Sequence, residues 1–166
     1  MRTWSRLVGD VFIEWLQAAR DLKWLDVGCG NGAFSGLISN SCFSKQVVAI
    51  DPSFEQIDFA RTRSDATDAS FRVGNAMSFE EDNNTFDLAV MALVIFFVPD
   101  PPKGVSEMVR VVKKGGLVTS YTWDTLNKGS PSSLITGHLI DMGFKPDSPP
   151  NPQVSEMAAL NKLLTD

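Results

Sequence analysis

Hydrophobic positions along the chain alternate between short apolar runs and stretches with helical spacing. Between Trp4 and Ala19, apolar side chains recur at steps of three and four, which predicts an amphipathic helix packed on the rest of the fold. Four short runs rich in apolar residues then predict strands: 22–27, 46–51, 70–73 and 86–94. Because helical patterns separate most of these runs, we expect strand-helix units in series.

The pattern continues with one more helix and a fifth strand. Asp100-Pro101-Pro102 opens the helix, since proline is tolerated in a first helical turn. Lys113 and Lys114 suit its carboxyl end, Gly115-Gly116 stops it, and 117–123 follows as a strand. This alternation predicts an α/β fold, a doubly wound and mostly parallel sheet with helices on both faces.

A glycine-rich turn after the first strand is the candidate site for a ligand that contains adenosine. Gly28 and Gly30 let the backbone approach a ligand closely, because no Cβ intervenes. With Ala33 they satisfy the dinucleotide-binding fingerprint. With Gly32 they equally satisfy the shorter motif of methyl-donor enzymes. Asp51 ends the second strand and suits the ribose hydroxyls of either cofactor, so the turn leaves both open.

Three further features favour a methyl donor over NAD. Asp26 precedes the first glycine by two residues, and a carboxylate there repels a pyrophosphate but attracts the ammonium of a methionine-derived ligand. A chain of 166 residues leaves no room for the separate substrate domain of a dehydrogenase. Tyr121, the only tyrosine, is followed four residues later by Thr125 rather than by the lysine of short-chain dehydrogenases.

Five motifs occur in a fixed order within roughly residues 15–124. They are Leu25-Asp26-Val27-Gly28-Cys29-Gly30-Asn31-Gly32, Val48-Ala49-Ile50-Asp51-Pro52-Ser53, Gly74-Asn75-Ala76, Phe86-Asp87-Leu88-Ala89-Val90 and Arg110-Val111-Val112-Lys113-Lys114-Gly115-Gly116. Together they resemble the class I S-adenosylmethionine-dependent methyltransferases, particularly the small-molecule branch of the ubiquinone- and menaquinone-biosynthesis type. The resemblance implies a Rossmann-like sheet of order 3-2-1-4-5, with the cofactor at the carboxyl ends of strands one, two and four.

The resemblance also implies roles for individual residues in binding S-adenosylmethionine. Asp26 would orient the ammonium group, directly or through water, and the backbone from Gly28 through Cys29 to Gly30 would close on the methionine and ribose. Asp51 would accept hydrogen bonds from both ribose hydroxyls.

Four further positions would contact the rest of the cofactor. Pro52 would pack on the adenine, Asn75 and Ala76 would meet its edge, and Ala92 would lie beside the methionine part. Asn75 departs from the aspartate that the family usually has, so we expect weaker binding rather than its loss.

The acceptor and any catalytic base are harder to predict, because a sulfonium methyl is already activated and needs mainly alignment and exclusion of water. His138 is expected to be an ordinary helix residue, and Asp100-Pro101-Pro102 a helix start rather than a nucleic-acid methyltransferase motif. We therefore assign no catalytic residue. Four residues near the carboxyl edge of the sheet are candidates to contact an apolar or aromatic acceptor: Trp4, Phe12, Trp123 and Asp124.

Composition limits the partners. The net charge is −5 and no basic run occurs, which disfavours a nucleic-acid-binding face. The two cysteines and the single histidine show no metal-ligand spacing, so no metal is expected. Free cysteines favour a cytoplasmic location. No apolar run approaches the roughly 20 residues that span a membrane.

We predict one domain over 1–166, made of an amino-terminal helix (1–20), a core (22–124) and a helical carboxyl-terminal segment (125–166). Families of this kind add two strands after the fifth, so we expect a shortened protein or a fragment. Its fifth strand would then be an exposed edge through which it forms a homodimer. The alternatives to methyl transfer are a protein that binds S-adenosylmethionine without catalysis and, more remotely, an NAD-dependent oxidoreductase.

Overall fold

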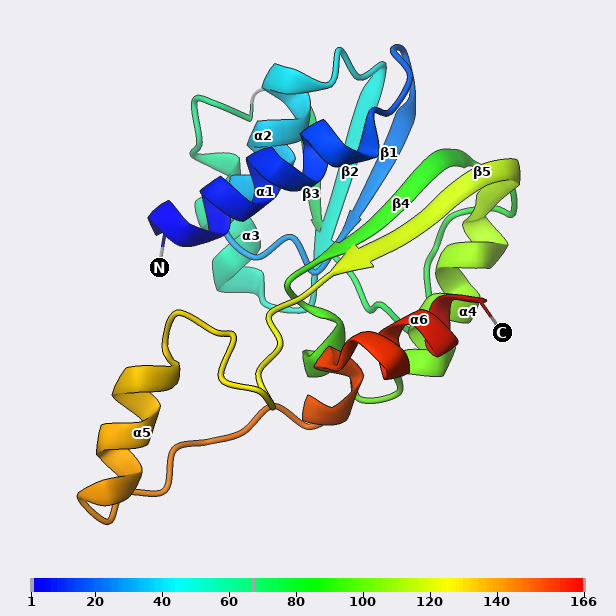
Figure 1. Cartoon of the computed structure of the whole chain (residues 1–166). Coiled ribbons are helices and arrows are strands. Elements are labelled where there is room, and N and C mark those ends of the chain that lie inside the picture. The colour runs from blue at the N-terminus through cyan, green and yellow to red at the C-terminus, as the bar shows by residue number, and fades with distance from the viewer. Residues whose placement is uncertain (1, 67, 166) are drawn as a thin grey trace.

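The fold is built on a parallel sheet of five strands (Figure 1), in a computed structural model that describes residues 2–66 and 68–165. The strands are β1 (Lys23–Val27), β2 (Gln46–Asp51), β3 (Ala69–Val73), β4 (Phe86–Ala92) and β5 (Val112–Tyr121). Their order is β3-β2-β1-β4-β5, and every neighbouring pair is parallel. The predicted fold class and strand order are therefore confirmed.

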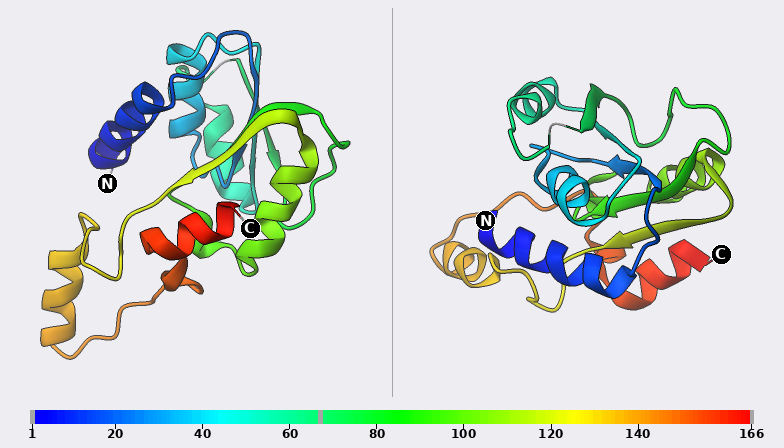
Figure 2. Two further views of the ribbon diagram at one scale, coloured as in Figure 1. Left: turned by 45° about the vertical axis from the view of Figure 1, so that its right-hand side comes forward. Right: turned by 90° about the horizontal axis from the view of Figure 1, so that it is seen from above.

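Helices cover both faces of the sheet, as the two views of Figure 2 show. One face carries α1 (Arg2–Leu16), α2 (Ala33–Ser41) and α3 (Phe54–Arg61), and the other carries α4 (Pro101–Val111) and α6 (Met157–Thr165). Alternate residues of β1 divide the core accordingly: Trp24 packs with the α1–α2 layer, whereas Leu25 and Val27 pack with α4 and α6.

Helix α1 buries only part of its predicted apolar stripe. Phe12 lies in the core, and Gly9 is buried against α2. Trp4 and Trp15 point outward and remain 59% and 72% exposed. The apolar residues of α1 are spread over more than one side of the helix, so packing on a single neighbouring layer cannot cover them all.

The boundary between α4 and β5 differs from the sequence prediction. Helix α4 ends at Val111, and β5 begins at Val112, before the glycine pair that was expected to stop the helix. A register shift follows, in which Phe86 pairs with Val112 but Leu88 with Leu117. Lys113 donates to Asp87 Oδ1 at 2.7 Å, so this lysine is held by the neighbouring strand rather than by the end of the helix.

The segment after β5 contains α5 (Ser133–Asp141) and a short 3₁₀ helix, η2 (Pro152–Ser155), before α6. Helix α5 has no buried residue and stands apart from the sheet layers in Figures 1 and 2. The chain then returns to the core, where Asn151 Nδ2 donates to the carbonyl oxygen of Val98 at 2.7 Å. None of the described helices is both long enough and apolar enough to cross a membrane.

Candidate functional site

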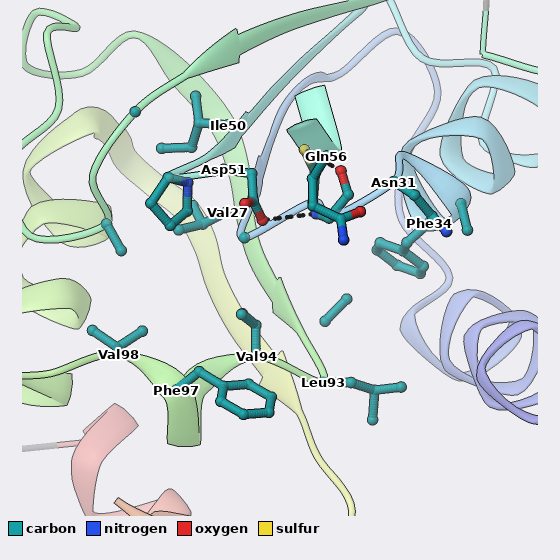
Figure 3. Close-up of a pocket in the computed structure, with 18 of the residues that line it drawn as sticks. Val27, Asn31, Phe34, Ile50, Asp51, Gln56, Leu93, Val94, Phe97 and Val98 are labelled. Carbon is teal, nitrogen blue, oxygen red and sulfur yellow. Dashed lines mark hydrogen bonds between the residues drawn. The ribbon is translucent and has the colours of Figure 1, made fainter. Parts of the chain in front are cut away.

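A cavity of about 1030 Å³ opens at the carboxyl ends of β1, β2 and β4. This is where open parallel sheets bind ligands, at the point where the strand order reverses between β1 and β4. In Figure 3 Asp51 lies on one side of the cavity, opposite Leu93 and Phe97. Eight of the nine predicted cofactor-binding residues line it: Gly28, Cys29, Gly30, Asp51, Pro52, Asn75, Ala76 and Ala92.

The glycines of the turn serve different purposes. Gly28 has φ +74° and packs so tightly that a Cβ would lie 2.4 Å from Val94 Cγ2, so it lets the turn approach the loop after β4. Gly30 has φ +52° and an open side, where only Gln56 Oε1 lies as near as 4.0 Å to a Cβ position. A side chain at Gly30 would therefore project into the space that a ligand needs.

Asp51 joins the turn to the second strand. Its Oδ2 accepts from the Gly30 backbone N–H at 2.9 Å, shown as a dashed line in Figure 3, and its Oδ1 accepts from Ser53 N–H at 2.9 Å. Each carboxylate oxygen retains lone pairs for a further donor. The carboxylate is thus fixed at the cavity wall, in a position to bind two neighbouring hydroxyls.

Asp26 lies behind the cavity wall rather than in it. It is 0% exposed, its Oδ2 accepts from Ser35 Oγ of α2 at 2.6 Å, and its Oδ1 is buried without a partner among the described residues. Burial raises its pKa to about 7. Burial raises the pKa values of Cys29 and Tyr121, which both line the cavity, and the charge of Asp26 raises them further, so Asp26 lies close behind that wall.

The loop that was predicted to meet the adenine forms a turn closed by a hydrogen bond between its own residues. Asn75 Oδ1 accepts from Met77 N–H at 2.9 Å, so the amide oxygen that we expected to face adenine already holds the loop. The amide NH₂ of Asn75 remains available as a donor. Pro52 and Ala76 lie on the same cavity wall.

None of the four predicted acceptor residues lines the cavity. Trp4 is 59% exposed on α1, whereas Ser5 and Arg6 of the same turn line the cavity. Phe12 is buried behind the wall, with its ring 4.5 Å from that of Tyr121. Asp124 uses its carboxylate locally, accepting from Asn127 N–H at 3.1 Å, and Trp123 is half-buried beside it. His138 lies exposed on α5.

The structure adds cavity residues that sequence reasoning missed. Leu93 follows β4 with φ +60°, a left-handed conformation that costs a leucine about 1–3 kcal/mol, and its N–H donates to the Tyr121 carbonyl at 2.8 Å. Phe34 and Leu37 enter from α2 and Tyr121 from β5. The only sequence signal for them was aromatic and apolar content at helix starts and strand ends.

The cavity thus has a polar part and an apolar part. The Asp51 carboxylate and the Gly30 backbone suit a ligand with a diol, and the unpartnered Oδ1 of Asp26 behind the wall suits a cationic group. The residues present therefore fit an adenosine bearing a methionine. The apolar part, walled by Phe34, Leu37 and Leu93, suits a second, hydrophobic molecule. No three His, Cys, Asp or Glu side chains among the described residues group as metal ligands.

Comparison with known proteins points to one family. Residues 25–119 match the model of a family described as a methyltransferase domain. The ubiquinone biosynthesis O-methyltransferase of Rhizobium etli is 31% identical over 121 residues, which cover 72% of this chain and 48% of that protein. The demethylmenaquinone methyltransferase of Renibacterium salmoninarum is 31% identical over 139 residues, which cover 84% of this chain and 55% of that protein.

A similar solved structure is that of the (4+2) cyclase SpnF, with a TM-score of 0.61 and 28% identity over 69% of this chain and 43% of that chain. The chain spans about half the length of the curated relatives that it matches.

Proposed function

Because the chain belongs to the methyltransferase-domain family, we propose that it binds S-adenosylmethionine in this cavity and transfers the methyl group to a small molecule. The observation that carries the proposal is the position of Asp51. Its carboxylate is anchored by Gly30 N–H at 2.9 Å, in a cavity at the switch point of the sheet. A fixed carboxylate beside an open glycine suits a ribose diol.

Residues of the turn and the neighbouring loops would each contact a different part of the cofactor. Asp51 would accept from the ribose hydroxyls, and Gly28, Cys29 and Gly30 would present the backbone to the methionine part. Asp26 would neutralise the ammonium group from behind the wall, through its unpartnered Oδ1. Pro52 and Asn75 would flank the adenine with Ala76, and Ala92 would lie beside the methionine.

The chemistry needs alignment more than a dedicated catalyst. S-adenosylmethionine supplies a methyl group activated by its sulfonium sulfur. The protein's part is to hold the acceptor in line with that methyl group and to keep bulk water away. Leu93 and Phe97, opposite Asp51, would form with Val94 the apolar wall that keeps water out. We assign no side chain as a catalytic base.

The acceptor is proposed to be a small apolar or aromatic molecule that is not a nucleic acid. Two relatives are named as a ubiquinone biosynthesis O-methyltransferase and a demethylmenaquinone methyltransferase, and an acceptor of this apolar class agrees with the apolar end of the cavity. The cyclase SpnF shares 28% identity with this chain, so methyl transfer needs its own test apart from cofactor binding. Both cysteines are free thiols, in keeping with action in the cytoplasm.

Transfer of radiolabelled methyl from S-adenosylmethionine to a panel of phenols, catechols and hydroquinones tests the proposal. We expect label in at least one extracted product, and its loss in Asp51→Ala, since the ribose anchor is gone. The matched control is Asp58→Ala, which removes an exposed carboxylate on α3 outside the cavity. Cofactor binding without transfer to any acceptor would instead support the non-catalytic alternative.

A further inference from the structure

The far end of the cavity is closed by α1, which approaches α2 unusually closely. At Gly9, a Cβ would lie 2.9 Å from Leu37 Cδ2, 3.3 Å from Phe34 Cδ2 and 3.4 Å from the Tyr121 hydroxyl oxygen. Glycine inside a helix costs about 1 kcal/mol relative to alanine. Here it lets the α1 backbone lie directly against the residues that wall the apolar end.

This close approach places the preceding turn of α1 at the cavity. Ser5 and Arg6, four and three residues before Gly9, both line it. Arg6 is the only lysine or arginine among the lining residues, and Asp51 is the only carboxylate. Among the described residues that line the cavity, the negative group is thus Asp51, at the predicted ribose site, and the positive group is Arg6, at the α1 end.

The guanidinium of Arg6 has no carboxylate partner within residues 2–66 and 68–165, where it forms no ion pair. Hydrogen bonds from Arg63, whose Nη2 lies 2.6 Å from Asp65 Oδ2, lower the pKa of Asp65, and the charge of Arg6 contributes least to this shift. Burial raises the pKa of Tyr121, and the charge of Asp10, one turn further along α1, raises it further. Among the described residues, Asp10 forms no ion pair with Arg6. The guanidinium therefore remains available for an anion.

The apolar residues around Arg6 indicate what the uncharged part of the ligand would be. Phe34 and Tyr121 pack edge to face with centroids 5.6 Å apart, and Phe12 supports both rings from behind. Leu37 and Leu93 complete this wall. Such a surface suits a flat, mainly apolar ring.

We propose that the acceptor carries an anionic group, such as a carboxylate, on an aromatic or other apolar ring, and that Arg6 binds this group while Phe34, Leu37 and Leu93 pack on the ring. This inference rests on the proposed function, since it assigns the cavity beyond the cofactor. Arg6 acts as a specificity residue, and Gly9 is a positioning residue that acts through α1.

The test is calorimetric titration of the protein saturated with S-adenosylhomocysteine. The probes are 4-hydroxybenzoate and indole-3-acetate, each compared with its uncharged amide. At least one acid is expected to bind about three- to tenfold more tightly than its amide, the range for a charge pair open to solvent. Arg6→Gln removes this preference and leaves the affinity for S-adenosylhomocysteine unchanged. Arg20→Gln, which removes an exposed arginine stacked on Phe43 and outside the cavity, retains the preference.

Gly9→Ala provides a second variant that should still fold, because alanine favours the helix and the added Cβ meets the movable ends of side chains. Its Cβ displaces Leu37 and Phe34 or the whole of α1, so we expect weaker binding of both the acids and the amides with unchanged binding of S-adenosylhomocysteine. Equal binding of acid and amide by the wild-type protein, binding of no probe, or an acid preference that survives Arg6→Gln would overturn the inference. Failure to bind S-adenosylhomocysteine would overturn the proposed function itself.

Discussion

Asp26 carries a buried carboxyl group whose pKa is raised to about 7, mainly because burial disfavours its charged form. In the unfolded chain the group ionises near its usual value of 3.8. Its contribution to stability is therefore fully present below that pH and is lost as the pH rises through 7. Above pH 7 the ionised carboxylate therefore lowers the stability of the folded chain.

Asp26→Asn should make the folded protein more stable at pH 8 by about 2–4 kcal/mol, because the amide avoids burying a charge. The difference should shrink toward pH 4. Urea denaturation followed by circular dichroism at the two pH values measures it, with exposed Asp58→Asn as the control. A stability change that is the same at both pH values would contradict the raised pKa.

The same residue should link cofactor binding to pH. A cation paired with Asp26 favours its ionised form, so binding should release a proton near pH 7, and the affinity for S-adenosylmethionine should rise with pH through that range. Calorimetry in two buffers of different ionisation enthalpy counts the protons released. Asp26→Asn is expected to abolish the release and to weaken binding about tenfold; unaltered proton release in this variant would remove Asp26 from the site.

At the scale of elements, α4 holds the loop that follows the adenine side of the cavity. Glu107 Oε2 accepts from Phe79 N–H at 2.9 Å, and Arg110 donates to the Phe79 carbonyl at 3.1 Å. Hydrogen bonds from Arg110 lower the pKa of Glu107 to about 2. The helix and the loop are thereby joined by hydrogen bonds from two α4 residues, which also pair with each other at 2.9 Å; Glu107 is buried and Arg110 half-buried.

Glu107→Gln should destabilise the protein by about 1–3 kcal/mol at pH 7, the usual cost of losing a charge-assisted hydrogen bond in a buried place. Because the pKa of Glu107 is depressed, its stabilisation is present above pH 4.5 and is lost as the pH falls toward 2. Denaturant titrations at pH 7 and pH 3 should therefore show a smaller difference at the lower pH. Lys162→Gln, on exposed α6 surface, serves as the control.

Elements with strong local signals were predictable from the sequence. The glycine turn and the strand Gln46–Asp51 lie where the sequence predicts them, because turn chemistry and apolar runs specify them without distant contacts. The start of β5 was not predictable in this way. Lys113 is fixed by Asp87, 26 residues earlier, and such a long-range pair leaves no local pattern.

The direction in which individual side chains of α1 point could not be predicted from the sequence either. Periodicity placed Trp4 and Phe12 on one amphipathic helix, yet Trp4 faces outward and Phe12 lies behind the cavity wall. Residues Ser5 and Arg6 reach the cavity because Gly9 brings α1 against α2, and this contact depends on tertiary packing. The cofactor half of the site followed from motifs, whereas the acceptor half needed the three-dimensional arrangement.

At the scale of the whole molecule, β5 is an edge strand that pairs only with β4 among the described strands. Leu117 on this strand is exposed, and Val11 and Trp15 of α1 also present apolar surface to solvent. An open edge beside apolar surface favours pairing with another strand. A second copy of the chain offers the same edge, so we propose that it forms a homodimer there.

Light scattering coupled to size exclusion tests this proposal over a wide range of protein concentration. We expect the dimer fraction to grow with concentration and to fall in Leu117→Lys, since a charge on an edge strand opposes pairing. Leu134→Lys, on exposed α5, should not change it. A wild-type chain that stays monomeric at the highest concentration would contradict association through β5.

Calorimetric titration with S-adenosylmethionine, S-adenosylhomocysteine and NAD tests whether the cavity beside the glycine turn binds S-adenosylmethionine. We expect saturable one-to-one binding of the first two, no binding of NAD, and a loss of affinity of about tenfold or more in Asp51→Asn. Tight binding of NAD alone, or an affinity for S-adenosylhomocysteine that Asp51→Asn leaves unchanged, would contradict this expectation.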